Sequence, residues 1–335
     1  MRKLSIINKL IYVINYIFAI LLLIGFVLPY ISPKTAPSLS VLSLSVPVLI
    51  IVNLLFVIYW LVGLKKQALL SLFCLGIGYF SSSPLYIFSN SATKATNEIS
   101  IMNYNVRLFN AYHWFKKEHI PTQIAHFITK ENPDIVCVQE YSPLSEITYP
   151  FQYIKTLKDK GKFGQAIYSK YKIINQGSLD FKHTSNNAIF VDVIKNRDTI
   201  RIYNVHFESL GLKVNKENLG QKSSEKLIER MGNEFIKQQN QVEQVVAHKN
   251  KCKYPVFISG DFNNTAYSWT YNHLITNMKD SFIEAGHGFG KTFQLKQIPL
   301  RIDFIFADKA FIFTEHKNYN LKYSDHEPIM AKIGI

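Results

Sequence analysis

The stretch Pro255-Val-Phe-Ile-Ser-Gly-Asp-Phe-Asn263 places a short apolar run directly before an acidic turn. The run Pro255–Ser259 is continuous and short, which predicts a strand that is buried on both faces. Asp261 and Asn263 follow that strand at once, and loops at strand ends are where binding and catalytic residues are commonly built. Gly260-Asp261 alone is also compatible with a plain turn, so the rest of the chain has to decide.

The same arrangement, a polar residue directly after an apolar strand, recurs along residues 98–335. The expected strands are Glu98–Val106, Asp134–Gln139, Gly164–Tyr168, Ala188–Ile194, Thr199–His206, Ile302–Phe306 and Ile329–Ile333, and the expected helices are Thr122–Lys130 and Lys222–His248. Because strands outnumber helices, the pattern favours a mixed α/β sandwich over a doubly wound sheet. The polar residues at strand ends are Asn105, Glu140, His206, Asp261, Asn263, Asp303, Asp325 and His326.

Taken in this order, these residues resemble the endonuclease/exonuclease/phosphatase superfamily. The most specific parts are Asn105 with its preceding strand, Gln139-Glu140, Gly260-Asp-Phe-Asn263 and Ser324-Asp-His326, with Arg301-Ile-Asp303 and Gly164-Gln-Ala-Ile-Tyr-Ser169 also in place. The resemblance covers about residues 98–335. It implies a four-layer α/β/β/α sandwich of the DNase I-like type and hydrolysis of phosphoester bonds.

For the metal, the resemblance implies Mg²⁺ or Mn²⁺ held by Glu140, with Asn105 beside it and Asp325 reaching it directly or through water. A phosphodiester is anionic and resists an incoming nucleophile, whereas a divalent ion neutralises charge and stabilises the leaving oxygen. Mg²⁺ prefers one or two carboxylates and several waters, which agrees with this set of ligands.

For the reacting water, the resemblance implies that Asp261 orients or deprotonates it and that Asn263 holds it or a phosphate oxygen. Asn105 and Arg107 are expected to bind substrate, because a guanidinium pairs well with phosphate.

Two histidines complete the implied machinery. His326 contacts the phosphate or transfers a proton, and Asp303 hydrogen-bonds its ring, which fixes the tautomer and raises the pKa. His206 donates to a phosphate oxygen or protonates the leaving group. Which residue is the acid and which the base stays open at this point.

The first 89 residues differ sharply in composition from the rest. They contain no Asp or Glu and only six of the 38 Lys and Arg, whereas all 24 acidic residues lie from Glu98 onward. Three apolar runs, 10–31, 41–64 and 68–88, predict transmembrane helices, because about 20 apolar residues span the hydrocarbon core. A cleaved signal peptide fits less well, since more apolar runs follow the first. We expect an anchor at 1–89, a linker at 90–97 and a catalytic domain at 98–335.

Charge bias predicts the orientation of the anchor. With three crossings, one side of the membrane carries Arg2, Lys3, Lys9, Lys65 and Lys66, and the opposite side carries Lys34 and Lys94. Because basic residues are enriched in cytoplasmic loops, we expect the N-terminus in the cytoplasm. The catalytic domain is then outside the cytoplasm, attached to the plasma or inner membrane. This expectation depends on the third run, which Ser81-Ser-Ser-Pro84 interrupts.

Composition narrows the substrate only partly. The net charge near +8 after residue 89 suits an anionic substrate or anionic lipid, and it is equally typical of a solvated basic surface. A lipid headgroup is favoured by the anchor, and extracellular nucleic acid by His206 and Arg107, although no dense stripe of basic and aromatic residues indicates a dedicated nucleic-acid surface. A non-enzymatic scaffold of the same fold is disfavoured, because the set of polar residues is complete. No obligate protein partner is indicated.

Two further features of the sequence exclude a phosphate loop and a framework of zinc sites or disulfides. Gly286-His-Gly-Phe-Gly-Lys-Thr292 looks like a phosphate loop, but the first glycine of that pattern would fall at position 285, which is Ala. The isolated Cys74, Cys137 and Cys252 show neither zinc spacing nor a disulfide framework. The insertion between His206 and Asp261 begins with Glu208–Lys216 and is expected to be a surface loop that feeds a crossover helix.

Overall fold

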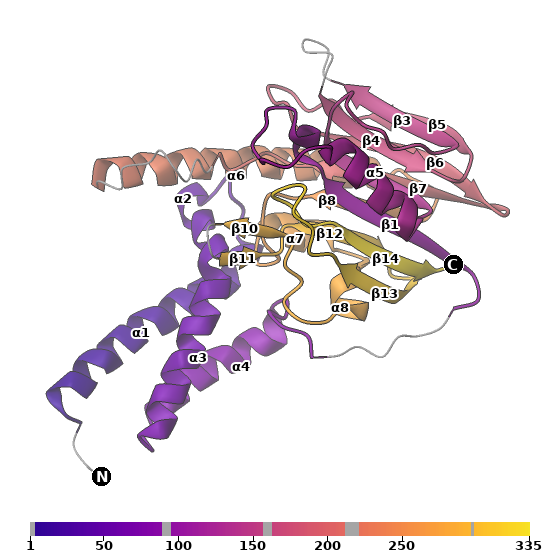
Figure 1. Ribbon diagram of the computed structural model, residues 1–335. Helices are drawn as coiled ribbons and strands as arrows, with labels where there is room; N and C mark the ends of the chain where they lie inside the picture. The colour runs from indigo at the N-terminus through magenta and orange to yellow at the C-terminus, as the bar shows by residue number, and fades with distance from the viewer. Residues whose placement is uncertain (1–3, 89–94, 157–162, 212–220, 296–297) are drawn as a thin grey trace. The chain divides into compact units, whose positions relative to one another are not determined.

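A computed structural model (Figure 1) describes residues 4–88, 95–156, 163–211, 221–295 and 298–335. It divides into two compact units. The first comprises Met1–Leu85, Asn218–Gln239 and Thr265–Asn272, and the second comprises Tyr86–Glu217, Asn240–Asn264 and His273–Ile335. Part of the expected linker, three of the basic residues used for orientation (Arg2, Lys3 and Lys94) and residues 212–216 of the insertion lie outside the described residues.

Two six-stranded sheets form the second unit. The first sheet has the order β13 (Ile312–Asn318), β14 (Ile329–Gly334), β1 (Glu98–Asn105), β2 (Ile135–Tyr141), β4 (Gly164–Ser169) and β3 (Phe151–Thr156). The second has the order β5 (Ile173–Ser178), β6 (Asn187–Lys195), β7 (Asp198–His206), β8 (Val256–Asp261), β12 (Asp303–Asp308) and β9 (Met278–Asp280). A ribbon of β10 (Phe293–Leu295) and β11 (Ile298–Leu300) completes the described strands.

The main core lies between the two sheets. Ile101, Ile135 and Ile167 of the first sheet join Ile202 and Phe257 of the second in one buried cluster. Because both faces of the central strands are covered, these strands are continuously apolar rather than alternating. The expectation of a strand buried on both faces at residues 255–259 is confirmed in β8, where every residue is buried.

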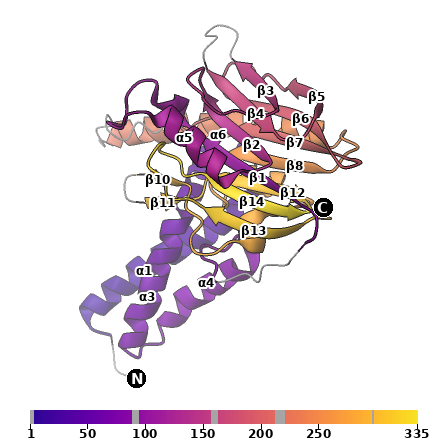
Figure 2. The ribbon, with the colours of Figure 1, turned by 45° about the vertical axis from the view of Figure 1, so that its right-hand side comes forward.

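Helices cover the outer faces of the sheets. In α5 (Ile120–Glu131), Ile124 and Ile128 are buried against the outer face of the first sheet (Figure 2). On the second sheet, the last part of α6 (Gln221–Lys249) packs through His248, whose Nδ1 lies 2.6 Å from the hydroxyl of Tyr203 in β7. The order of layers in this unit is therefore helix, sheet, sheet, helix, as the sequence predicts.

Several elements were not expected from the sequence, among them β3, β5, β9, β13 and the short helices α7 (Trp269–Leu274) and α8 (Ser281–Ala285). Edge strands such as β3 and β5 have half-exposed, polar surfaces. They consequently lack the continuous apolar run that marks the central strands.

Three apolar helices, α1 (Ile6–Val27), α3 (Val46–Val62) and α4 (Ala68–Ser81), dominate the first unit. Two stretches, Ile6–Tyr30 and Pro37–Val62, are long and apolar enough to cross a membrane. The helix in the third expected span, 68–88, is shorter than expected: α4 has 14 residues, which at 1.5 Å per residue gives about 21 Å, against the roughly 30 Å of hydrocarbon. The Ser-Pro sequence that follows ends the helix.

A buried polar cluster ties the three helices together. Asn15 Nδ2 donates to Ser71 Oγ at 2.6 Å, Ser71 Oγ donates to Asn53 Oδ1 at 2.9 Å, and Trp60 Nε1 donates to Asn15 Oδ1 at 3.0 Å. Because an unpaired polar group costs free energy in an apolar interior, this cluster specifies how α4 packs on α1 and α3. Helix α4 is therefore an integral part of the apolar unit.

Two segments that are distant in sequence also belong to this unit. Gln239 Oε1, on α6, accepts from Ser32 Oγ at 2.8 Å and from the backbone N–H of Lys34 at 3.0 Å. Asn272 Nδ2 donates to the carbonyl of Pro29 at 3.1 Å, and Tyr267 packs in the cluster formed by the apolar helices. The apolar unit thus holds the start of α6 and the segment that begins two residues after Asn263.

Candidate functional site

The carboxyl ends of two parallel strand pairs carry the polar residues. The pairs β1–β2 and β7–β8 run parallel. Asn105 and Glu140 therefore lie at the carboxyl ends of β1 and β2 in the first sheet, and His206 and Asp261 lie at the carboxyl ends of β7 and β8 in the second. In the second sheet, Asp261 is in register with His206 on one side and with Asp303 of β12 on the other. Hydrogen bonding between strands thus aligns three of the eight residues side by side.

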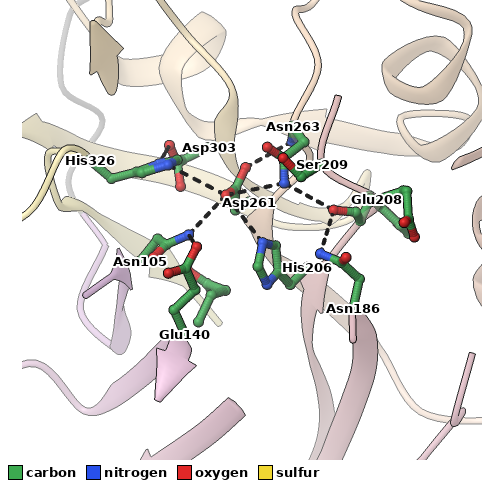
Figure 3. Close-up of polar contacts among 12 residues, drawn as sticks. Asn105, Glu140, Asn186, His206, Glu208, Ser209, Asp261, Asn263, Asp303 and His326 are labelled. Carbon is green, nitrogen blue, oxygen red and sulfur yellow. Dashed lines mark hydrogen bonds and ion pairs between the residues drawn. The ribbon is translucent and has the colours of Figure 1, made fainter. Parts of the chain in front are cut away.

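Asp261 lies at the centre of the site (Figure 3). Its Oδ2 accepts from Asn105 Nδ2 at 3.0 Å and lies 3.6 Å from Nε2 of both His206 and His326. Its Oδ1 accepts from the backbone N–H of Asn263 at 2.8 Å. Burial raises the pKa of Asp261 to about 6, against the lowering effect of His326. The carboxylate is therefore ionised at neutral pH and able to accept a proton.

His326 and Asp303 form a buried pair. His326 Nδ1 lies 2.9 Å from Asp303 Oδ2, and Thr292 Oγ1 accepts from the backbone N–H of Asp303 at 3.1 Å. Burial alone would lower the pKa of His326, but the charges of Asp303 and Asp261 more than offset it and raise the pKa to about 10. His326 consequently stays protonated at neutral pH, as the sequence reasoning expects of its pKa.

The pKa of the second histidine, His206, is shifted in the opposite direction. Burial lowers the pKa of His206, and the attraction of Asp261 only partly opposes this. The carbonyl of Phe207, the next residue, accepts from Asn263 Nδ2 at 2.9 Å and from Asn186 Nδ2 at 2.8 Å. These two amides hold the end of β7 and thereby the His206 ring against Asp261. At neutral pH the ring is neutral and carries one N–H.

Glu140 provides carboxylate oxygens of the kind that a divalent ion needs, whereas Asn105 beside it has its Oδ1 occupied by the backbone N–H of Arg107 at 3.1 Å. Asn105 Nδ2 donates to Glu140 Oε1 at 3.3 Å, and burial raises the pKa of the Glu140 carboxyl. Glu140 forms no ion pair with any described residue. A buried carboxylate without a cation is unfavourable, so a divalent cation fits here by supplying the missing positive charge.

Asp325, the third expected metal ligand, has a different partner. Its Oδ2 lies 3.0 Å from Nη1 of Arg107, the expected phosphate-binding residue. A second possible ligand group is Asp261, Asp303 and His326, whose ligand atoms lie within 4.8 Å of one another. In that group His326 Nδ1 is paired with Asp303, so Nε2 is the ring nitrogen that faces Asp261 and would serve as a ligand.

Three residues of the site have left-handed backbone conformations. Arg107, Glu140 and Asn263 have φ of 44°, 49° and 50°, and Glu140 lies where the register of β2 with β4 shifts. Such conformations cost about 1–3 kcal/mol for residues other than glycine and cluster at functional sites. The bulge at Glu140 redirects its side chain from the strand into the site.

Gly260 has a steric reason to be glycine. A Cβ at this position would lie 2.0 Å from the carbonyl oxygen of Val205, the residue that precedes His206. The close pairing of β7 with β8 therefore requires glycine directly before Asp261.

The structure brings together Asn105, Glu140, His206, Asp261, Asn263, Asp303 and His326, with Arg107 and Asp325 paired beside them. Sequence reasoning missed a supporting layer of buried amides. Gln139 Nε2 donates to Asn103 Oδ1 and Asn204 Oδ1, each at 2.7 Å, and Asn103 Nδ2 donates to Asp303 Oδ1 at 3.3 Å. Amides inside otherwise apolar strands were the signal that could have revealed them.

Groups of the glycine-rich loop at residues 286–292 form hydrogen bonds within the fold. The backbone N–H of Gly288 donates to the carbonyl of Ile87 at 2.8 Å, and Thr292 serves to position Asp303.

Comparison with known proteins identifies relatives of both parts. A model of the endonuclease/exonuclease/phosphatase family matches residues 102–326, and a model of a domain of unknown function matches residues 8–85. No curated protein matches the chain. An endonuclease/exonuclease/phosphatase from Bacteroides vulgatus superposes with a TM-score of 0.55 at 18% identity, covering 72% of this chain and all of that one.

Two further solved structures share the fold. A humanized TDP2 of D. rerio gives a TM-score of 0.54 at 16% identity and covers 71% of this chain and 99% of its own. A family protein from Bacteroides thetaiotaomicron gives 0.52 at 16% identity, covering 72% and 98%. At these identities the likeness establishes the fold.

Proposed function

Because this chain belongs to the endonuclease/exonuclease/phosphatase family, we propose that it hydrolyses phosphoester bonds at the site around Asp261. Its membership makes it a metal-dependent phosphoester hydrolase. The observation that carries the assignment of the site is the cluster on Asp261 Oδ2, where Asn105, His206 and His326 converge.

In this proposal Asp261 is the general base. Its pKa, raised to about 6 by burial, lies just below neutral pH, where a base is both ionised and basic enough to take a proton from water. Asn263, whose backbone N–H holds the other carboxylate oxygen, orients Asp261 and binds the water or a phosphate oxygen.

His326 is a fixed cation rather than a base. Its pKa is raised to about 10, so its ring N–H and positive charge are available to the phosphate throughout the neutral range. Charge placed in advance where negative charge develops is a large source of rate enhancement. His206, which burial keeps neutral, donates its N–H to a phosphate oxygen or to the leaving oxygen.

Glu140 and Asn105 would hold Mg²⁺ or Mn²⁺. The bound ion would neutralise phosphate charge and stabilise the leaving oxygen. Arg107, ion-paired with Asp325 in the structure, is free to exchange that carboxylate for a substrate phosphate, since the pair is partly exposed and such pairs are weak.

The function is tested with the full-length chain, purified in mild detergent with Mg²⁺ or Mn²⁺. The substrates are bis(p-nitrophenyl) phosphate, DNA, RNA, sphingomyelin, phospholipids and phosphoinositides. Asp261→Asn and His326→Gln should abolish turnover, and Asp198→Asn, at the exposed start of β7, should not. Metal-independent turnover, or none on any substrate, would refute the proposal and favour a scaffold that has kept the fold.

We also propose that residues 1–89 anchor the catalytic domain, residues 98–335, in a membrane through a short linker at 90–97. Only 28% and 33% of the two long apolar windows are buried, which supports membrane spans over core helices of a soluble protein. Helix α4 likewise exposes apolar residues, among them Leu69, Phe73 and Phe80 at 64%, 68% and 87%. Exposed apolar side chains on all three helices support a lipid environment around them.

The proposed orientation puts the catalytic domain outside the cytoplasm, with α4 as a short third crossing. Five basic residues against two support this. A reporter fused after Ile335 distinguishes the two topologies. Extracytoplasmic reporter activity is expected; cytoplasmic activity would mean that α4 enters the membrane without crossing it.

This proposal includes two substrate classes: nucleic acid, which would make the protein a nuclease, and lipid headgroups, which would make it a lipid phosphodiesterase. The anchor supports a substrate near the bilayer, and the pair of His206 and Arg107 supports a polynucleotide.

A further inference from the structure

Two pockets adjoin the reacting centre. One, of about 200 Å³, has His206 in its wall together with Lys155, Gln165, Phe181 and Asn186; we call it the His206 pocket. The other, of about 530 Å³, contains Asp325 together with Phe115, Lys116, Lys117, Lys291 and Lys322; we call it the lysine pocket. A substrate whose phosphate sits at Asp261 can extend into either.

The His206 pocket is electrically balanced. Its single lysine, Lys155, is ion-paired with Asp180 at 2.9 Å. Two of its amides are used within the fold: Asn186 Nδ2 donates to the carbonyl of Phe207, and Asn187 Nδ2 donates to Ser178 Oγ at 2.7 Å. Gln165 Oε1, by contrast, is buried without a hydrogen-bond partner among the described residues. This lining offers an uncharged polar surface beside an aromatic ring, which suits a neutral hydroxylated group rather than another phosphate.

The lysine pocket has an excess of positive charge. Its two carboxylates are already paired, Asp325 with Arg107 at 3.0 Å and Glu327 with Lys291 at 2.6 Å. Lys116, Lys117 and Lys322 are exposed and form no ion pair with any described residue. Three ammonium groups around one hollow attract an anion and repel one another when it is absent.

The pocket is directly connected to the site. Ser324, which lines it, donates its Oγ to the backbone carbonyl of Asn105 at 2.8 Å. Its wall continues through Arg107, whose guanidinium lies 4.7 Å and 5.3 Å from the ring centroids of Trp114 and Phe115. Lys117 is in turn held over the ring of Tyr323 at 5.1 Å. Aromatic rings thus position the cations at one side of the reacting phosphate.

We propose that the lysine pocket binds a second phosphate group of the substrate, next to the phosphoester that is cleaved. This inference rests on the proposed function and narrows its substrate class to phosphoesters that carry at least two phosphates. The uncharged part of the substrate, whether it is the leaving group or stays on the phosphate, lies in the His206 pocket. Lysines act as point charges that tolerate varied phosphate positions, so the same chemistry could come from a phosphorylated polyol headgroup or from an oligonucleotide.

The test compares matched substrates that differ by one phosphate. One arm uses the dinucleotide TpT and its 5′-phosphorylated form pTpT; the other uses inositol 1-phosphate and inositol 1,4-bisphosphate. With the full-length chain and Mg²⁺, the extra phosphate is expected to lower KM about tenfold in at least one arm, the value of about 1.4 kcal/mol for a charge-assisted contact. The arm that shows the preference identifies the source of the phosphate.

The triple variant Lys116→Ala/Lys117→Ala/Lys322→Ala should lose this preference while keeping the kcat of the singly phosphorylated substrate. The matched control is Lys251→Ala/Lys253→Ala/Lys309→Ala. It removes the same charge from exposed positions at the far ends of β8 and β12. Equal KM values within both pairs, or a preference that survives in the first variant, would overturn the proposal.

Binding separates this proposal from the proposed function. Calorimetry on Asp261→Asn measures the affinity for both pairs without turnover. Tighter binding of the doubly phosphorylated members, lost in the lysine variant, supports the pocket even if wild type hydrolyses neither. Turnover without any such preference supports the hydrolase and refutes the pocket.

Discussion

Replacing Asp303 with asparagine should shift the alkaline limb of the pH–activity profile to lower pH. Asparagine is isosteric and its oxygen still accepts from His326 Nδ1, so the substitution removes the charge while keeping the contact at 2.9 Å. In wild type the pKa of His326 is raised to about 10 from 6.5. This rise corresponds to roughly 5 kcal/mol in favour of the protonated ring, net of a burial effect that opposes it.

Asp303 is the largest of the effects that raise this pKa, followed by Asp261. A partner charge in a hydrogen bond contributes about 1.5–3 kcal/mol. Its loss should therefore lower the pKa by about two units, to about 8. His326 would then lose its proton as the pH rises through 8, whereas the wild-type ring keeps it to about 10.

The assay is kcat/KM for bis(p-nitrophenyl) phosphate with Mg²⁺ between pH 6 and 9.5. Wild type and Asp198→Asn should be level from pH 7 to 9, whereas Asp303→Asn should fall about fivefold between pH 8 and 9, as expected for loss of one essential proton from a group with a pKa of about 8. Because a merely structural defect lowers activity evenly across pH, the shape of the curve is the informative readout. A wild-type profile in Asp303→Asn would show that His326 is not held protonated by Asp303.

Further substitutions address the metal, the sheet, acid stability and the apolar unit. Glu140→Gln should raise the Mg²⁺ concentration for half-maximal activity at least tenfold, because it removes the one carboxylate at the expected metal position; an unchanged metal dependence would move the ion elsewhere. Gly260→Ala should destabilise the fold by about 3 kcal/mol, measured by thermal unfolding, since its Cβ meets the backbone oxygen of Val205 at 2.0 Å; a wild-type Tm would contradict the pairing of β7 with β8. His316 is buried and burial lowers its pKa to about 4, so between pH 6.5 and 4 the unfolded chain binds a proton that the folded chain does not. Stability should fall over that interval by up to about 3 kcal/mol, and His316→Asn should lack this part of the loss in pH-dependent denaturation. Asn15→Leu should destabilise α4 packing by about 1 kcal/mol, because Trp60 and Ser71 lose their partner; detergent-denaturation curves equal to wild type would rule out a structural role for the polar cluster.

The candidate site could be predicted almost completely from the chain, and particular residues show why. Each of Asn105, Glu140, His206 and Asp261 follows a central strand whose continuous apolar run is local and visible in the sequence. Central strands of such sheets end at one edge, so residues that follow them meet. In each case the polar residue at the strand end could be recognised from the local sequence pattern.

Other parts of the site depend on contacts between distant segments. Asn103 and Asn204 were hidden among apolar residues, and only the pairing of the two sheets shows that Gln139 contacts both and that Asn103 supports Asp303. The lysine pocket combines Lys116 with Lys291 and Lys322, three positions that no local motif connects. The sequence likewise did not show that Arg107 is the charge partner of Asp325.

The sequence by itself determined the mixed α/β sandwich, the candidate residues at strand ends and the presence of an apolar N-terminal region, because strand periodicity, strand-end polarity and composition are local properties. The four-layer order and the proposed roles of those residues followed from the family resemblance. Only the tertiary structure decided the charge states within the site, where the shared Asp261 and burial set His326 and His206 apart. It also shortened the third apolar run to α4 and assigned residues 265–272, adjacent to the catalytic loop, to the apolar unit. Burial, hydrogen-bond partners and long-range packing arise when segments far apart in the chain come together, and no stretch of sequence carries them alone.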